Sequence, residues 1–289
     1  MTDYATRVRV NWELAARRMR AARTRHRPID GRRAAFLIAA GIVLVVAVSV
    51  LFDARAITWA RTLPPSVHGV FNWITQWGQS GWLLIPSAII VIVVMLGDWR
   101  RVSRASAAAW FEIATFAAVL FVVVAATGLA TDVVKPIVGR FRPDYVAQGA
   151  YAFAPFSFGG YSNYSFPSGH ATTAAAVAVM AVFVPGVVSV PIVVAAALVA
   201  VSRVIVGVHF PGDVVGGALI GLGVGYLILR AMTEAGIVYA VRRGRLRHRF
   251  GALRRLRDRG GRLAELFPAL WVALSPPLPR APIPPQDPR

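Results

Sequence analysis

Residues 171–202 read ATTAAAVAVMAVFVPGVVSVPIVVAAALVAVS, a stretch of 32 amino acids without one charged side chain. A transmembrane helix needs about 20 apolar residues, so the stretch is too long for a single span. Pro185, Gly186 and Pro191 interrupt it near its centre, where they predict a tight turn. The stretch therefore predicts two consecutive membrane helices.

Further apolar segments flank this pair on both sides. Hydrophobic residues make up 56% of the chain and charged residues only 16%, against about 25% charged residues in a typical soluble domain. We therefore expect an all-α integral membrane protein, a bundle of six transmembrane helices at about Ala34–Phe52, Trp82–Gly97, Ser106–Thr131, Gly169–Val184, Val188–Val208 and Asp213–Leu229. In the last helix Gly217, Gly221 and Gly225 recur at every fourth position, which favours close packing of a neighbouring helix.

Positive charge concentrates outside these segments. The net charge is +19, of which residues 1–33 carry +7, residues 233–289 carry +8 and the loop 98–105 carries +2. The positive-inside rule places these three regions, and hence both termini, in the cytoplasm. We expect the two basic arms to contact anionic lipid headgroups, the first as an amphipathic surface helix. Binding to nucleic acid is not expected, because no nucleic-acid-binding motif accompanies the charge.

The loops on the other side of the membrane are nearly neutral. Residues 53–81 contain Trp59, Trp73 and Trp77, which favour the membrane interface. Residues 145–166 are rich in Tyr and Phe, which is typical either of a lid over a lipid headgroup or of an aromatic belt. The chain has no Cys, so disulfides and thiolate metal sites are excluded.

Ionisable side chains at membrane depth are costly and therefore mark functional sites. Here they gather at three places, all at the predicted outer face of the membrane: Lys135, Arg140 and Arg142 after the third span, His170 at the start of the fourth, and Arg203, His209 and Asp213 between the fifth and sixth. The chain therefore predicts one polar site built from segments far apart in sequence.

Three of these cations suit a multiply charged anion. Lys135 and Arg142 are seven positions apart and would share a face of a short helix bounded by Pro136 and Pro143. With Arg203 they offer two planar guanidinium groups and one ammonium point charge to phosphate oxygens. Arg140 is interpreted as a bystander or a headgroup contact.

The remaining residues supply the groups needed for phosphoryl transfer. Ser168 and Gly169 stand at the start of a predicted helix, where free backbone N–H groups attract anions. Asp213, four positions after His209, can orient that imidazole. If His209 attacks phosphorus and His170 protonates the leaving oxygen, the three cations neutralise the developing charge without a metal ion.

The chain resembles the type-2 phosphatidic acid phosphatase superfamily on a signature of three parts. The parts are Lys135 with Arg142-Pro143 after six residues, Pro167-Ser168-Gly169-His170, and Ser202-Arg203 with His209 after five further residues and Asp213 after three more. No position departs from the signature, and the one Lys of the chain stands where the signature requires it.

The resemblance implies a metal-independent, cofactor-free membrane lipid phosphatase. It implies that His209 forms a phosphohistidine oriented by Asp213, and that His170 protonates the leaving group. Five residues are implied to bind the phosphate: Lys135, Arg142, Ser168, Gly169 and Arg203. The expected organisation is a basic arm at 1–33, a phosphatase domain at 34–232 and a basic, Pro-rich tail at 233–289, in a bacterial inner membrane with the site facing the periplasm.

Several substrates and two other functions stay open at this stage. Polyprenyl diphosphate, phosphatidylglycerol phosphate and phosphatidic acid all carry a suitable phosphate, and lipid A phosphate is an alternative. The same site could instead pass phosphate to another acceptor as a phosphotransferase. A lipid-binding protein without catalysis is the third hypothesis, and it predicts that His209→Ala leaves function intact.

Overall fold

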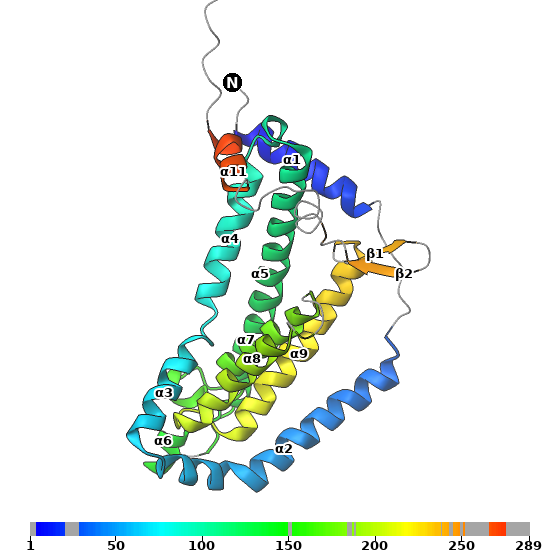
Figure 1. Ribbon diagram of the computed structural model, residues 1–289. Helices are drawn as coiled ribbons and strands as arrows, with labels where there is room; N and C mark the ends of the chain where they lie inside the picture. The colour runs from blue at the N-terminus through cyan, green and yellow to red at the C-terminus, as the bar shows by residue number, and fades with distance from the viewer. Residues whose placement is uncertain are drawn as a thin grey trace, which may run out of the picture.

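The computed structural model shows an all-helical bundle with a small β-hairpin (Figure 1). It describes residues 4–20, 29–149, 152–183, 187, 189–237, 239–242, 245–248, 251 and 266–275. The helices are α1 (Tyr4–Arg20), α2 (Gly31–Arg61), α3 (Pro65–Gln76), α4 (Gly81–Leu96), η1 (Trp99–Arg101), α5 (Arg104–Val138), α6 (Pro143–Ala147), η2 (Tyr161–Asn163), α7 (Gly169–Met180), η3 (Ala181–Phe183), α8 (Ser189–Ile205), α9 (Pro211–Glu234) and α11 (Leu266–Leu274). The strands are β1 (Tyr239–Arg242) and β2 (Arg245–His248).

The bundle contains the apolar helices of a multi-pass membrane protein. Four helical segments in the described residues are long and apolar enough to cross a bilayer, namely α2, the pair α3–α4, α5 and α9. The helices α7–η3 and α8 are also apolar but shorter, at Gly169–Phe183 and Ser189–Ile205. All six predicted segments are therefore helical, and the number that cross the membrane stays a prediction. The predicted turn at Pro185 and Gly186 lies outside the described residues.

Helices α7 and α9 form the closest-packed pair of the bundle, and glycines on α9 make this possible. A Cβ atom added to Gly217 would lie 2.3 Å from the Ser168 carbonyl oxygen, and one added to Gly221 would lie 2.5 Å from the Thr172 carbonyl oxygen. Gly225 is less crowded, since its added Cβ would stand 3.4 Å from Val179. The predicted close packing is confirmed, and it holds the start of α7 against the start of α9.

The end of α5 differs from the prediction. The third span was expected to end near Thr131, with a separate short helix between Pro136 and Pro143. Instead α5 continues through Pro136 to Val138, because that proline lies in the last turn and breaks no helix further on. Gly139, at φ +59°, then terminates α5 in the left-handed conformation. Lys135 therefore lies on α5 and Arg142 precedes α6, so the two do not share one helix.

Both terminal arms pack on the turn between α4 and α5. Asn11 of α1 donates to the Met95 and Gly97 carbonyl oxygens at 2.8 and 2.9 Å. The other arm is held by Leu266 of α11, whose carbonyl oxygen accepts from the indole nitrogen of Trp110 in α5 at 2.9 Å. Figure 1 shows α1 and α11 together at the end of the bundle opposite α3 and α6. The first arm is a helix as predicted, whereas the hairpin and α11 were not foreseen in the tail.

Candidate active site

The predicted site residues lie at the end of the bundle that holds α3 and α6. Four of them stand at the ends of long helices: Lys135 in the last turn of α5, His170 in the first turn of α7, Arg203 in the last turn of α8, and Asp213 in the first turn of α9. Because α5 and α8 end where α7 and α9 begin, residues up to 78 positions apart in sequence reach one depth.

The start of α7 brings together a helix N-terminus and a cation. Ser168 is the N-cap, fully buried, and its hydroxyl accepts from the Ala171 N–H at 3.5 Å. A Cβ added to Gly169 would lie 3.6 Å from the Lys135 ammonium nitrogen. The Lys135 ammonium also pairs with Asp132 at 2.8 Å, on the exposed side of α5. A positive charge therefore stands beside backbone N–H groups that have no helical partner.

The two arginines are held by neutral partners. Arg142 donates from Nε to the Tyr161 carbonyl oxygen at 2.8 Å and from Nη1 to the Val208 carbonyl oxygen at 3.1 Å. Its guanidinium also stacks on the Tyr161 ring, 3.8 Å from the ring centre. Arg203 is 8% exposed, donates to the Thr75 hydroxyl, and has a buried Nε without a partner in the described residues. None of these partners is acidic, so both side chains keep their charge free to bind an anion.

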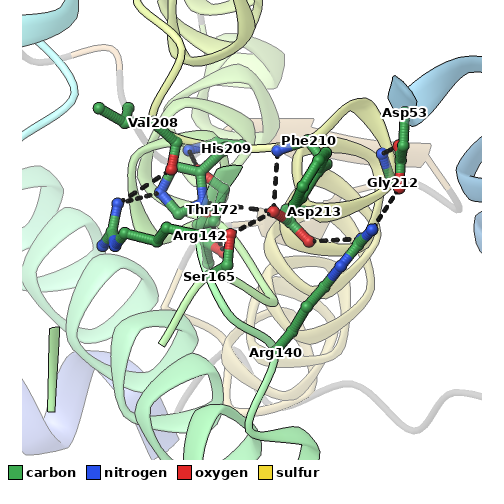
Figure 2. A network of polar contacts seen from close by, with 12 residues as sticks. Asp53, Arg140, Arg142, Ser165, Thr172, Val208, His209, Phe210, Gly212 and Asp213 are labelled. Atoms are coloured by element: carbon green, nitrogen blue, oxygen red, sulfur yellow. Dashed lines mark hydrogen bonds and ion pairs between the residues drawn. The ribbon is translucent and has the colours of Figure 1, made fainter. Parts of the chain in front are cut away.

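The His209 ring lies between a carboxylate on one side and a guanidinium on the other. Its Nδ1 lies 3.6 Å from Asp213 Oδ2, and its Nε2 lies 3.5 Å from Arg142 Nη1 (Figure 2). Burial lowers the pKa of His209 to about 4, although the carboxylate of Asp213 acts in the opposite direction. The ring is therefore neutral at pH 7, with Nδ1 toward the carboxylate and Nε2 toward the cations.

Asp213 is the centre of a buried polar network (Figure 2). The carboxylate is fully buried, and its Oδ2 accepts from the Ser165 hydroxyl at 2.6 Å and from the Phe210 N–H at 2.9 Å. Its Oδ1 accepts from Arg140 Nη1 at 2.8 Å. These contacts on both oxygens fix the plane of the carboxylate that faces His209.

The interpretation of Arg140 as a bystander was wrong. Besides its contact with Asp213, Arg140 pairs through Nη2 with Asp53 Oδ2 of α2 at 2.5 Å. Asp53 is 5% exposed, and its Oδ1 accepts from the Gly212 N–H at 2.9 Å. The Arg140 guanidinium also lies over the Phe210 ring, 4.3 Å from its centre. Arg140 therefore bridges two buried carboxylates.

Sequence reasoning also missed Asp53 and Ser165. Asp53 carries the first charge after a predicted span and lies at the predicted depth of Arg140, so the rule that marks intramembrane charges would have selected it. Ser165 lies two residues before Pro167, which begins the second part of the signature, and no pattern in the sequence distinguishes it from other serines of the loop.

His170 lies in the electrostatic field of the whole cluster. The ring is partly buried, and the charges of four neighbouring groups also act on it: Arg203, His209, Arg142 and Lys135. Gly78, in the turn between α3 and α4, packs on His170, because a Cβ added there would lie 2.7 Å from the ring carbon Cδ2. The structure thus gathers all the predicted site residues around the starts of α7 and α9.

The aromatic loop before α7 contributes unequally to the site. Tyr161 stacks on Arg142 as described, and the Phe153 ring lies 5.6 Å from the Arg140 guanidinium. Phe156 and Phe158 are 74% and 81% exposed. The lid and the aromatic-belt interpretations both fit these side chains, and Tyr151 lies outside the described residues.

In the part of the chain that the structure describes, no group of three His, Cys, Asp or Glu residues could hold a metal ion.

The PAP2 superfamily model matches residues 116–237. The lipid A 1-phosphatase of Rhizobium johnstonii is 30% identical over 235 residues, which cover 80% of this chain and 93% of that protein. The lipid A 1-phosphatase of Rhizobium etli is 34% identical, over 75% of this chain and 87% of that protein. The phosphatidylglycerophosphatase B of Bacillus subtilis is 32% identical, over 67% of this chain and 89% of that protein. Since the resemblance read from the signature extends to relatives of nearly full length, the chain belongs to the PAP2 superfamily and is a phosphatase.

Proposed function

We propose that the chain hydrolyses the terminal phosphate of a membrane lipid through a phosphohistidine on Nε2 of His209. The orientation of this ring carries the proposal. Nδ1 faces the Asp213 carboxylate at 3.6 Å, so it is the nitrogen that holds the proton, and the lone pair of Nε2 faces the cations.

The proposed phosphate site lies between the cations and the start of α7. Lys135, Arg142 and Arg203 neutralise the phosphoryl oxygens, and the backbone at Ser168 and Gly169 adds N–H donors and the positive end of the helix dipole. Arg142 Nη1 lies 3.5 Å from His209 Nε2, so a phosphoryl group bound to this guanidinium stands beside the attacking nitrogen.

The first step transfers the phosphoryl group to the enzyme. The Nε2 lone pair of His209 attacks phosphorus, an N–P bond forms, and the bond from phosphorus to the lipid oxygen breaks. The negative charge of the bound phosphate favours the protonated form of His170, which acts as general acid and gives its proton to that oxygen. Asp213, whose Oδ2 lies 3.6 Å from Nδ1, stabilises the positive charge that develops on the His209 ring.

The second step releases phosphate. Water loses a proton to His170 and attacks phosphorus, while the N–P bond breaks and its electron pair returns to His209. Inorganic phosphate leaves, and both rings regain their starting protonation states. The three cations supply the charge stabilisation that a metal ion supplies in other phosphatases, so we expect activity without divalent metal.

A lipid substrate is supported by an apolar groove between α2 and α9. Two adjoining cavities of about 800 and 560 Å³ share Val45, Val46 and Phe166 in their linings. The second cavity reaches Asp53 and Arg140, next to Asp213. We propose that an acyl or prenyl chain lies in this groove while its phosphate enters the site.

The charge distribution supports an orientation of the bundle in the membrane, and the relatives bear on the lipid substrate. We propose six spans in a bacterial inner membrane, and for six spans the positive-inside rule places both termini in the cytoplasm and the site at the periplasmic face. Polyprenyl diphosphate, phosphatidylglycerol phosphate and phosphatidic acid remain the proposed substrate classes. The similarity to two lipid A 1-phosphatases favours lipid A 1-phosphate as a second candidate.

Phosphate release in detergent from a panel of these lipids, with chelator present, tests the proposal. We expect release by the wild type without divalent metal and near-complete loss in His209→Ala. A fully active His209→Ala variant would refute the nucleophile, and strict dependence on magnesium would refute the metal-free mechanism. Transfer of phosphate to a lipid or sugar in place of water, followed with ¹⁸O-labelled water, would identify a phosphotransferase instead.

A further inference from the structure

A second cationic cavity lies at the opposite end of the bundle, between α1 and the turn that joins α4 to α5. It has a volume of about 250 Å³, and its charged lining consists of Arg7, Asp98, Arg100 and Arg104. Three positive groups against one carboxylate give the lining a net positive charge. The cavity is remote from the phosphatase site, since α1 and α3 lie at opposite ends of the bundle (Figure 1).

The Arg7 side chain is buried in this cavity without a hydrogen-bond acceptor among the described residues for two of its nitrogen atoms. The residue is only 8% exposed, and its Nε and Nη1 are buried without a hydrogen-bond partner in the described part of the chain. Its guanidinium carbon lies 5.1 Å from the centre of the Tyr4 ring, which is a weak partner for a buried charge. A buried guanidinium without acceptors is unfavourable, so an anion that supplies acceptor oxygens here would be bound strongly.

The carboxylate in the lining does not satisfy Arg7. Asp98 Oδ1 pairs with Arg100 Nε at 3.0 Å. Burial acts to raise the pKa of Asp98, but the hydrogen bond and charge of Arg100, with a smaller contribution from Arg7, hold the pKa below its usual value. Asp98 is therefore ionised and already committed to Arg100, which leaves the charges of Arg7 and Arg104 for a ligand.

Specific hydrogen bonds hold the two walls of the cavity together. Asn11 is 4% exposed, and its two hydrogen bonds to the Met95 and Gly97 carbonyl oxygens fix α1 on the end of α4. Arg7 stands four positions before Asn11, on the same face of α1. Arg7 is therefore held over the α4–α5 turn.

The apolar rim indicates a lipid rather than a soluble anion. Val10 and Leu14 line the cavity and are 39% and 48% exposed, and Trp12 of the same helix is 60% exposed. A basic helix that exposes apolar side chains such as these is typical of one that lies in the membrane interface. At that depth the phosphate of a lipid of the same leaflet can reach the cavity while its acyl chains stay in the bilayer.

We propose that this cavity binds the phosphodiester headgroup of an anionic phospholipid, with Arg7 and Arg104 on the phosphate oxygens. The site is distinct from the phosphatase site and does not depend on the proposed reaction. In the orientation proposed above it would fix the first arm to the cytoplasmic leaflet.

Native mass spectrometry of the full-length protein in neutral detergent tests this site, with phosphatidylglycerol and phosphatidylcholine as probes. Phosphatidylglycerol has no terminal phosphate, so hydrolysis does not consume it. We expect phosphatidylglycerol to bind in preference to phosphatidylcholine, and Arg7→Gln to weaken its binding by about tenfold or more. Arg104→Gln, on a different helix, should weaken it also, and this keeps the test valid if Arg7→Gln does not fold.

Arg9→Gln is the matched control, because Arg9 lies on the same helix with a side chain that is 81% exposed and paired with Glu13. It should bind phosphatidylglycerol as the wild type does. Equal binding by all variants, or an equal loss in Arg9→Gln, would overturn the site in favour of diffuse attraction by the arm. Displacement of the lipid by millimolar inorganic phosphate would overturn the lipid as occupant and indicate a soluble anion. Phosphate release should be unchanged in Arg7→Gln, so failure here is separable from failure of the proposed reaction.

Discussion

Arg140 donates from Nη1 to Asp213 Oδ1 at 2.8 Å, and its other terminal nitrogen pairs with Asp53 at 2.5 Å. The three side chains are almost completely buried, with side-chain exposures of 12% for Arg140, 7% for Asp53 and 0% for Asp213. Asp53 belongs to α2 and Asp213 to α9. The first apolar helix of the bundle therefore reaches the carboxylate that faces His209.

This relationship predicts that Arg140 positions Asp213 without touching the phosphoryl group that reacts. Arg140→Gln should lower kcat by about 100-fold, because a small displacement of Asp213 misorients the nucleophile. KM should change much less, since the phosphate-binding residues keep their places. Arg140→Lys, which restores one charge to the network, should recover part of kcat. Steady-state kinetics on a short-chain lipid phosphate measures both constants.

A purely structural role for Arg140 would give a different result. Loss of one partner from a buried ion pair destabilises by about 3–5 kcal/mol, so Arg140→Gln should also lower the unfolding temperature. If Arg140 is purely structural, unfolding accounts for the whole loss of activity. The folded fraction of Arg140→Gln would then have the specific activity of the wild type. Equal kcat values for Arg140→Lys and Arg140→Gln would also contradict the positioning role.

The apolar helices and the signature residues could be predicted because they follow from local patterns. An uncharged run longer than one span requires a turn, and charges at matching helix ends must meet once the helices alternate in direction. The network around Asp213 could not be predicted in the same way. It depends on the position of Gly139, which ends α5 and aims Arg140 inward, and on a tertiary contact between α2 and α9 that no spacing encodes.

The short helix predicted between Pro136 and Pro143 shows a related limit. A proline was interpreted as a boundary, yet Pro136 lies inside the last turn of α5. Since only two helical residues follow Pro136, the proline does not end the helix, and the boundary is set by Gly139 instead. The hairpin of β1 and β2 was missed for a different reason, because the Arg-rich segment was interpreted as a tail from its charge alone.

Gly139 should be sensitive to substitution. An added Cβ would lie 1.8 Å from the Ala154 carbonyl oxygen, and φ is +59° there. Gly139→Ala should therefore destabilise the protein and move Arg140, with loss of both thermal stability and activity. Gly128, within α5, has no atom within 4 Å of an added Cβ. Gly128→Ala should be neutral or slightly stabilising, because Ala favours a helix over Gly by about 1 kcal/mol. Equal effects of the two changes on thermal unfolding would contradict this assignment.

Acidification should destabilise the fold through His209. Its pKa is lowered by burial to about 4, whereas an unfolded His titrates near 6.5. The unfolded state therefore binds more protons between these values, and stability falls as pH decreases from about 6.5 toward 4. The linkage relation gives a decrease of about 2 kcal/mol in the free energy of unfolding at pH 5 relative to pH 7.

Thermal unfolding at pH 7 and pH 5 checks this contribution when the wild type is compared with His209→Gln. The variant has no imidazole at this position, so acidification should lower its unfolding temperature less than that of the wild type. Identical shifts in the two proteins would show that the ring of His209 does not hold a lowered pKa.

The proposed orientation can be tested with single cysteines, because the chain has no Cys of its own. Phe158→Cys places a thiol at a position that is 81% exposed at the site end of the bundle, and Arg9→Cys places one on α1 at the opposite end. A maleimide that cannot cross the inner membrane should label Phe158→Cys in intact cells once it has entered the periplasm. It should label Arg9→Cys only after the cells are opened, because the positive-inside rule keeps the basic arm in the cytoplasm. The reverse pattern would invert the bundle and place the phosphatase site in the cytoplasm. Labelling of both thiols in intact cells would mean that the two ends of the bundle do not lie on opposite sides of the membrane.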